Sequence, residues 1–139
     1  MARLVGLSIG DLQGKYGDLK ALEIAARAGA DSVDFDLCRD ENDYRNKGSI
    51  YSNGFEAIEE YYTEIKKRSD ELGIIIGQTH GKMPGFINVK AEDDALVKNT
   101  EYDCFATAIL GASVCVVHNA TSIFLGPDPD PELMHRLSF

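Results

Sequence analysis

Three segments of the sequence share one layout, in which a helical stretch ends at a glycine, a short apolar run follows, and a polar residue comes seven positions after the glycine. They run from Gly29 to Asp36, from Gly73 to His80 and from Gly111 to His118. A glycine just past a helix end accommodates the left-handed conformation that reverses the chain, and five or six β-prone residues have the length of a buried parallel strand. The equal spacing therefore predicts three strands that end at matching heights.

The polar residues that close these segments are candidate substrate-binding residues, because ligands of parallel α/β proteins bind beyond the C-terminal ends of the strands. A single histidine in an apolar strand is usually a structural residue, but His80 and His118 share one position on neighbouring strands and are expected to face a ligand. Asp36 has two open roles, since its carboxylate could also brace its own loop. In a closed barrel the stagger of the strands would place His80 in a different layer from Asp36 and His118.

The strand at 32–35 alternates strictly between polar and apolar residues. This pattern buries Val33 and Phe35 on one side, beneath helices, and turns Asp34 and Asp36 to the other side. A carboxylate inside a sheet is costly unless it is paired or near solvent. The two aspartates therefore predict a hydrated mouth at this end of the sheet.

The remaining sequence alternates strands with helices and contains no linker or change of composition that would divide it. Strands are predicted at 4–9, 32–35, 74–79 and 114–117. Helices are predicted at 19–28, with Asp18 as N-cap, at 55–72, and from Pro131 onward. A further helix is predicted to begin at a cap formed by Asp93 or Asp94 and to end at Gly111. Its inward-facing residues are expected to be Val97, Cys104, Phe105 and Ala108. Residues 10–17, 37–54, 81–93 and 119–130 are predicted loops.

Long loops after strands and short turns after helices are typical of a parallel (β/α)8 barrel of TIM type. A complete barrel takes about 250 residues, whereas this chain has 139. The fold class is therefore α/β, and residues 1–139 are predicted to form one domain of about four βα units, the N-terminal half of such a barrel. This half is either truncated or completed by association.

Charge and composition narrow the possible partners. A net charge of −9 argues against a nucleic-acid binder, which needs a basic face. The absence of a membrane-length apolar run, of signal-peptide organisation and of paired cysteines makes the cytoplasm the expected location. Arg39, Arg45, Lys47 and Lys82 could together neutralise one phosphate group, although loop cations of this kind are usually solvated.

Several segments resemble the xylose isomerase-like superfamily, the sugar phosphate isomerase/epimerase barrels. The run AILGASVCVVH, which ends at His118, resembles the third helix and fourth strand of that family, and LGIIIGQTH, which ends at His80, resembles its third strand. The run AARAGADSVDFD, which ends at Asp36, resembles its second strand, with Asp34 where the family usually has glutamate. The similar segments follow one another in the family's order along nearly the whole chain.

The resemblance implies a sugar or sugar phosphate isomerase or epimerase. In that family a divalent metal ion (Mn, Mg, Co or Zn) and two carboxylates on strands five to eight move a proton next to a carbonyl group. Those strands are absent here, so this chain is expected to be inactive alone and to hold no metal of its own. Only His80 and His118 carry over from the resemblance, as residues that line the pocket of a small carbohydrate substrate, whereas Asp36 remains a candidate from its position alone.

Two alternatives remain open. Endonuclease IV-type DNA-repair barrels of the same superfamily bind zinc through histidines at the positions of His80 and His118, although a zinc site needs three or four ligands. The chain could instead be a non-catalytic half-barrel that forms a homo-oligomer, because Val114–Val117 would be an apolar strand at the sheet edge. A chain that stops as a helix begins favours truncation of a longer protein.

Overall fold

A computed structural model describes residues 4–120, 125 and 128–138 of the chain. Its single sheet has four parallel strands in the order β1-β2-β3-β4. The strands are β1 (Gly6–Ser8), β2 (Ser32–Asp36), β3 (Ile75–His80) and β4 (Cys115–Val116). The helices are α1 (Gly10–Tyr16), α2 (Asp18–Arg27), α3 (Phe55–Leu72), α4 (Lys90–Leu110) and α6 (Pro131–Ser138), with two short 3-10 helices, η1 (Asp40–Asn42) and η2 (Tyr51–Asn53).

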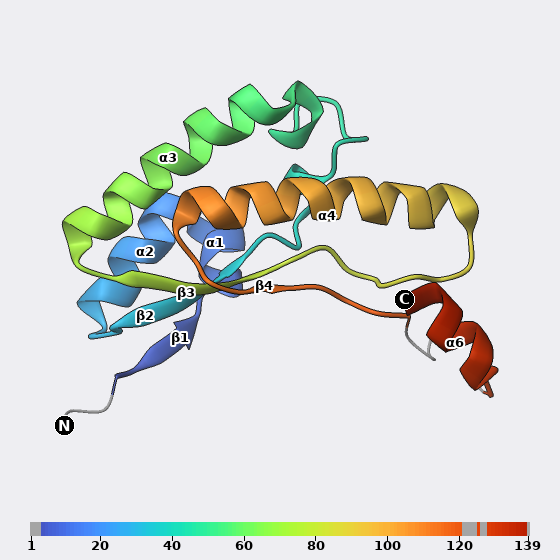
Figure 1. Cartoon of the computed structure of the whole chain (residues 1–139). Coiled ribbons are helices and arrows are strands. Elements are labelled where there is room, and N and C mark those ends of the chain that lie inside the picture. The colour runs from blue at the N-terminus through green and yellow to red at the C-terminus, as the bar shows by residue number, and fades with distance from the viewer. Residues whose placement is uncertain (1–3, 121–124, 126–127, 139) are drawn as a thin grey trace.

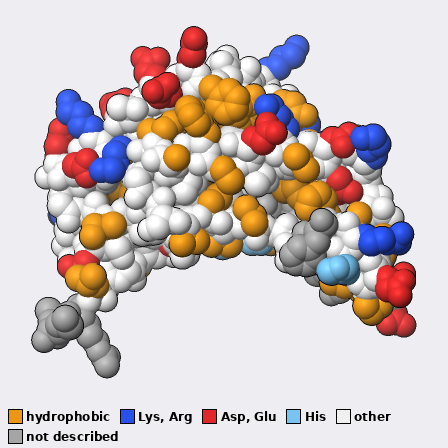
Figure 2. All heavy atoms as spheres, viewed as in Figure 1, with side chains coloured by type: hydrophobic (Ala, Val, Ile, Leu, Met, Phe, Trp, Pro, Cys, Tyr) orange, Lys and Arg blue, Asp and Glu red, His pale blue; other side chains and the backbone are white. Residues whose placement is uncertain are grey.

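Helices α1 to α4 lie on one side of the strands (Figure 1). This arrangement is an α/β half-barrel, as predicted. In the space-filling view charged side chains of both signs lie over the helical side (Figure 2). None of the described helices is both long and apolar enough to cross a bilayer.

The core lies between the strands and this helical layer. Val33 and Phe35 of β2 are buried, whereas the residues between them are only half-buried, which confirms the predicted alternation. Phe35 meets Tyr62 of α3 edge to face, with ring centroids 6.3 Å apart. The stripe of α3 that faces the core consists of Ile58, Tyr62, Ile65 and Ser69.

All three glycines predicted to follow a helix end have positive φ angles. Gly73 and Gly111 directly follow α3 and α4 with φ angles of 68° and 72°, and Gly29, which follows α2 after Ala28, has a φ angle of 84°. An L-residue with a side chain would be strained in this conformation. The chain can therefore reverse within one residue and enter the next strand directly.

The first helix was not predicted, because residues 10–17 contain three glycines and have the composition of a loop. In the structure Gly10–Tyr16 forms α1, and the buried side chain of Gln13 ties this helix to β2. The Gln13 amide donates to the carbonyl oxygen of Asp36 at 3.2 Å and accepts from its backbone N–H at 2.8 Å. A tertiary contact thus stabilises a helix that local propensity disfavours.

Asp18 does not cap α2, contrary to the prediction. It is the first residue of the helix and is buried, with no capping bond to the backbone. Its carboxylate accepts hydrogen bonds from Gln13, Arg39 and Tyr61, at 2.8 to 2.9 Å. The acidic residue that resembles a local cap is instead the centre of a long-range polar cluster.

The predicted inner face of α4 is also wrong. Val97 is 49% exposed, Cys104 and Ala108 are exposed, and Phe105 is half-buried. The buried face carries Asn99, Asp103 and Thr107, spaced by four residues, together with Ala95, Leu96, Tyr102, Ala106 and Leu110. Apolar periodicity cannot detect a core stripe that is partly polar, and it therefore assigned the wrong phase. The helix also begins at Lys90, before the predicted aspartate cap.

Element boundaries otherwise agree within a few residues. The first strand is shorter than predicted and β4 has two residues. The predicted loop at 37–54 contains η1 and η2. Part of the predicted loop at 119–130 lies outside the described residues.

The phase of α4 can be tested with two alanine substitutions on that helix. Asn99→Ala should lower the free energy of unfolding by roughly 1–3 kcal/mol, because the backbone N–H of Tyr44, which donates to the Asn99 side chain at 3.0 Å, would lose its partner. Val97→Ala should change it by less than about 0.5 kcal/mol. Urea unfolding followed by circular dichroism gives both values, and equal effects would contradict the observed phase.

Candidate substrate-binding site

The structure brings two of the three predicted site residues to one height and displaces the third. Asp36 and His80 are partners in the β2–β3 register, because a register shift after Val33 realigns the two strands. The partner of His80 on β4 is Val116, so His118 lies two residues further along. The prediction of matching heights is therefore right for Asp36 and His80 and wrong for His118. The second prediction, that the stagger of a barrel would place His80 in a different layer from Asp36, is not observed in this register.

His80 and His118 nevertheless meet. Residues two apart on an extended chain point to the same side, and the two imidazole rings lie 5.0 Å apart between centroids with an angle of 39° between their planes. The predicted histidine pair is therefore a contact in the structure. It stands at the C-terminal end of the sheet, where β3 and β4 lead into their loops.

Asp34 is the acidic partner of this pair. Its Oδ2 lies 3.7 Å from Nδ1 of His80. Asp36 has the other role left open by the sequence, because its Oδ1 accepts a hydrogen bond from the backbone N–H of Cys38 at 2.8 Å and braces the start of the loop. Of the two aspartates, Asp34 is thus the one that interacts with a histidine.

Two polar atoms of this group have no hydrogen-bond partner in the described part of the chain. They are Oδ1 of Asp34 and Nε2 of His118, and both are buried. A buried polar atom left without a partner costs about 1–3 kcal/mol, so such atoms mark places where a ligand or an ordered water supplies the missing bond. Burial, followed by the nearby charge of His80, lowers the pKa of His118, which favours its neutral imidazole.

The aspartates and His80 line an open hollow of about 620 Å³ at this end of the sheet. Its wall is formed by Ser8, Gly10, Asp11, Gly14, Asp34, Asp36, Cys38, Arg39, Glu41, His80 and Met83. Four of these residues are acidic. Carboxylates accept hydrogen bonds from hydroxyl groups, whereas their negative charge repels a phosphate at this wall.

Most of the loop cations that could have bound a phosphate are engaged with carboxylates. Arg39 pairs with Asp18 at 2.9 Å, Arg45 with Asp43 at 2.8 Å, and Lys82 lies 3.6 Å from Asp43. Their charges are therefore compensated within the fold. Lys47, the fourth, is exposed.

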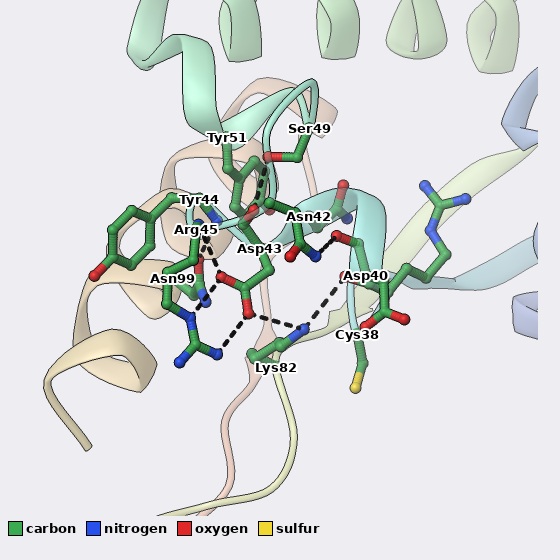
Figure 3. A network of polar contacts seen from close by, with 12 residues as sticks. Cys38, Asp40, Asn42, Asp43, Tyr44, Arg45, Ser49, Tyr51, Lys82 and Asn99 are labelled. Carbon is green, nitrogen blue, oxygen red and sulfur yellow. Dashed lines mark hydrogen bonds and ion pairs between the residues drawn. The ribbon is translucent and has the colours of Figure 1, made fainter. Parts of the chain in front are cut away.

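The loop between β2 and α3 is held by a polar network built around Asp43 (Figure 3). Asp43 is buried, and its hydrogen bonds from Arg45 are the main cause of a lowered pKa of its carboxyl group. The Lys82 ammonium also donates to the carbonyl oxygen of Arg39 at 3.4 Å. This network connects the β2–α3 loop to the segment after β3, directly beyond His80.

A second buried carboxylate, that of Asp103 on α4, holds the same segment from the helical side of the sheet. Its Oδ1 accepts from the Tyr51 hydroxyl at 2.6 Å and its Oδ2 from the backbone N–H of Lys82 at 2.9 Å. Burial raises the pKa of Asp103 to about 6, against the opposing effect of these bonds. Sequence reasoning missed Asp43 and Asp103 and considered Lys82 only as a possible phosphate ligand. The contacts that reveal their roles, Asp103 with Tyr51 and Lys82 and Asp43 with Lys82, join residues far apart along the chain. The aspartate at the buried spacing Asn99-Asp103-Thr107 was the one available indication.

The residues present do not make a metal site by themselves. Among the described residues, no group of three His, Cys, Asp or Glu side chains is placed to hold a metal ion. The zinc site of the endonuclease IV alternative needs three or four ligands, so the described part of this chain does not fit it.

Comparison with known proteins adds one solved structure. No family model matches the sequence, and no curated protein matches it at a significant level. The chain is similar to a crystal structure described as a sugar phosphate isomerase/epimerase from Parabacteroides distasonis, with a TM-score of 0.53 and 20% sequence identity. The similarity covers 99% of this chain and 44% of that chain, so this chain spans less than half the length of the matched protein. At this identity the comparison shows the fold, half of a TIM-type barrel, and thereby confirms the predicted architecture.

The raised pKa of Asp103 predicts a specific pH dependence of stability. In the folded state the pKa is about 6 instead of 3.8, so the stability that protonated Asp103 provides is complete below about pH 4 and is lost as the pH rises through 6. Relative to Asp103→Asn, which cannot ionise, the wild-type chain should lose roughly 3 kcal/mol of unfolding free energy across this window.

Urea unfolding at closely spaced pH values from 3.5 to 7 measures this difference. Asp94→Asn, at an exposed position on the same helix, controls for the loss of one carboxylate. Parallel pH curves for wild type and Asp103→Asn would show that Asp103 is not the group responsible.

Proposed function

We propose that this chain forms one wall of the substrate pocket in a sugar or sugar phosphate isomerase or epimerase of TIM-barrel type. The observation that carries the proposal is the contact between His80 and His118 at the C-terminal strand ends, with the buried atoms Asp34 Oδ1 and His118 Nε2 left without partners. The similarity to the sugar phosphate isomerase/epimerase from Parabacteroides distasonis supports the proposal at the level of fold.

The chemistry of the wall suits a polyhydroxylated ligand. An ionised carboxylate accepts hydrogen bonds from sugar hydroxyls, and a neutral imidazole both donates and accepts. Asp34 and His118 each offer one unused atom, and His80 lies between them with its ring against His118. A carbohydrate with adjacent hydroxyl groups could satisfy the unused atoms at once.

In this proposal the groups that carry out the reaction do not belong to Asp34, His80 and His118. A divalent metal ion would polarise the oxygens of the substrate, but the described residues of one copy of this chain lack a ligand set for it, so residues outside this copy would have to contribute ligands. This chain's own residues bind and orient the sugar. We therefore expect the isolated chain to bind sugar weakly and to catalyse no interconversion.

The proposal predicts that sugars shift the NMR resonances of two of the three histidines. Titration with D-xylose, D-fructose and D-fructose 6-phosphate should move the imidazole Cε1–H signals of His80 and His118 in a saturable manner. His135, which lies on α6, serves as an internal control and should not respond. His118→Asn should weaken the binding roughly 3- to 10-fold, the loss expected for one hydrogen bond.

Saturable binding that leaves both His80 and His118 unmoved would contradict the proposal. A shift of equal size at His135 would show that the sugars act non-specifically. Asp34→Asn, which keeps the size of the side chain but removes its charge, should weaken binding in the same range as His118→Asn.

A further inference from the structure

We propose that two copies of this chain associate through the edges of their sheets and close into one barrel of eight parallel strands. The proposal concerns the two ends of the sheet, β1 and β4, which are paired on one side only in the described part of the chain. It does not depend on which ligand the pocket binds.

The backbone of β1 offers a free row of hydrogen-bonding groups. In parallel strands, consecutive residues direct their backbone N–H and C=O groups to opposite sides. The carbonyl oxygen of Val5 accepts from Ser32, and the N–H of Ile9 donates to Asp34, so these residues point toward β2. The alternate residues, Gly6 and Ser8, therefore direct their backbone groups to the open edge.

The same geometry holds at the opposite edge. The carbonyl oxygens of Val114 and Val116 accept from the N–H groups of Thr79 and Gly81, both at 2.9 Å. Their backbone groups thus face β3, and those of Cys115 and Val117 face away from the sheet. Each end of the sheet therefore presents two residues that are able to pair with a further parallel strand.

Exposed apolar side chains accompany both edges. Leu4 and Val5, directly before β1, are 74% and 56% exposed, and Val114 and Val117, on either side of β4, are 50% and 52% exposed. An apolar strand edge that nothing covers is a surface for pairing or aggregation. The two pairs thus flank β1 and β4, the edge strands of the sheet in the described part of the chain.

A second copy fits both edges at once. All four strands run in the same direction, so a twofold axis along the strands places β4 of each copy beside β1 of the other, in parallel. The two seams are then identical, as in a closed cyclic dimer, and the eight strands reach the number of a TIM-type barrel. The matched solved chain is roughly twice as long as this one, which is the length that two copies supply together.

The proposal predicts a dimer that one edge substitution dissociates. Sedimentation velocity and light scattering should give twice the 15.2 kDa mass of the chain, and the dimer should tighten with added salt, since each copy carries a net charge of −9. Val117→Lys, which places a charge at the β4 edge, should raise the dissociation constant at least tenfold. The matched control is Val97→Lys, at a position of similar exposure on α4, which should leave the dimer intact.

Hydrogen–deuterium exchange distinguishes edge pairing from any other dimer. The amides of Gly6, Ser8, Cys115 and Val117 should exchange more slowly as the protein concentration rises through the dissociation constant. A monomer at 100 µM, or a dimer whose edge amides exchange at a rate independent of concentration, would overturn the proposal. A dimer that Val117→Lys leaves unchanged would do so as well, provided that circular dichroism shows the variant to be folded. A failure of sugar binding at His80 and His118 bears on the proposed function alone.

Discussion

A parallel sheet that carries helices on only one side must present two chemically different faces, and this constraint organises the whole molecule. In β2 the helical side receives Val33 and Phe35, which are fully buried, while the opposite side receives Asp34 and Asp36. Because side chains alternate along a strand, burial of the first pair leaves the second pair no other place. The hydrophobic core and the acidic wall are thus consequences of one five-residue alternation.

The sequence was sufficient wherever structure follows from local pattern, and insufficient wherever it depends on polar contacts across the chain. The β2 alternation, the helix at 55–72 and the glycines that follow α2, α3 and α4 could all be predicted. Helix α1 could not, because its stability depends on the bonds between Gln13 and the backbone of Asp36. The buried face of α4 could not be predicted either, because its polar residues Asn99, Asp103 and Thr107 contact residues distant in the sequence.

The site shows the same division. His80, His118 and Asp36 could be located from their spacing, but only the β2–β3 and β3–β4 registers reveal their relative heights. The partner of His80 is Asp34 instead of Asp36, because Asp36 is already bound to the backbone of Cys38. A pattern of residues thus identifies which side chains reach an edge, whereas competing hydrogen bonds decide which of them remain available to a ligand.

Buried carboxylates hold the loops that surround this wall. Asp18, Asp43 and Asp103 are each less than 5% exposed. Asp18 and Asp103 accept hydrogen bonds from residues distant in the sequence, whereas Asp43 accepts hydrogen bonds from the nearby Arg45 and forms an ion pair with the distant Lys82. A buried charge is tolerated only when it is well paired, so a shift of one loop would leave a carboxylate without its partners. The acidic composition therefore fixes the shape of the loops as well as the charge of the wall. Within the described residues the strand edges carry no comparable set of hydrogen bonds, and this contrast makes them the part of the sheet where a further strand can be added without breaking a bond seen there.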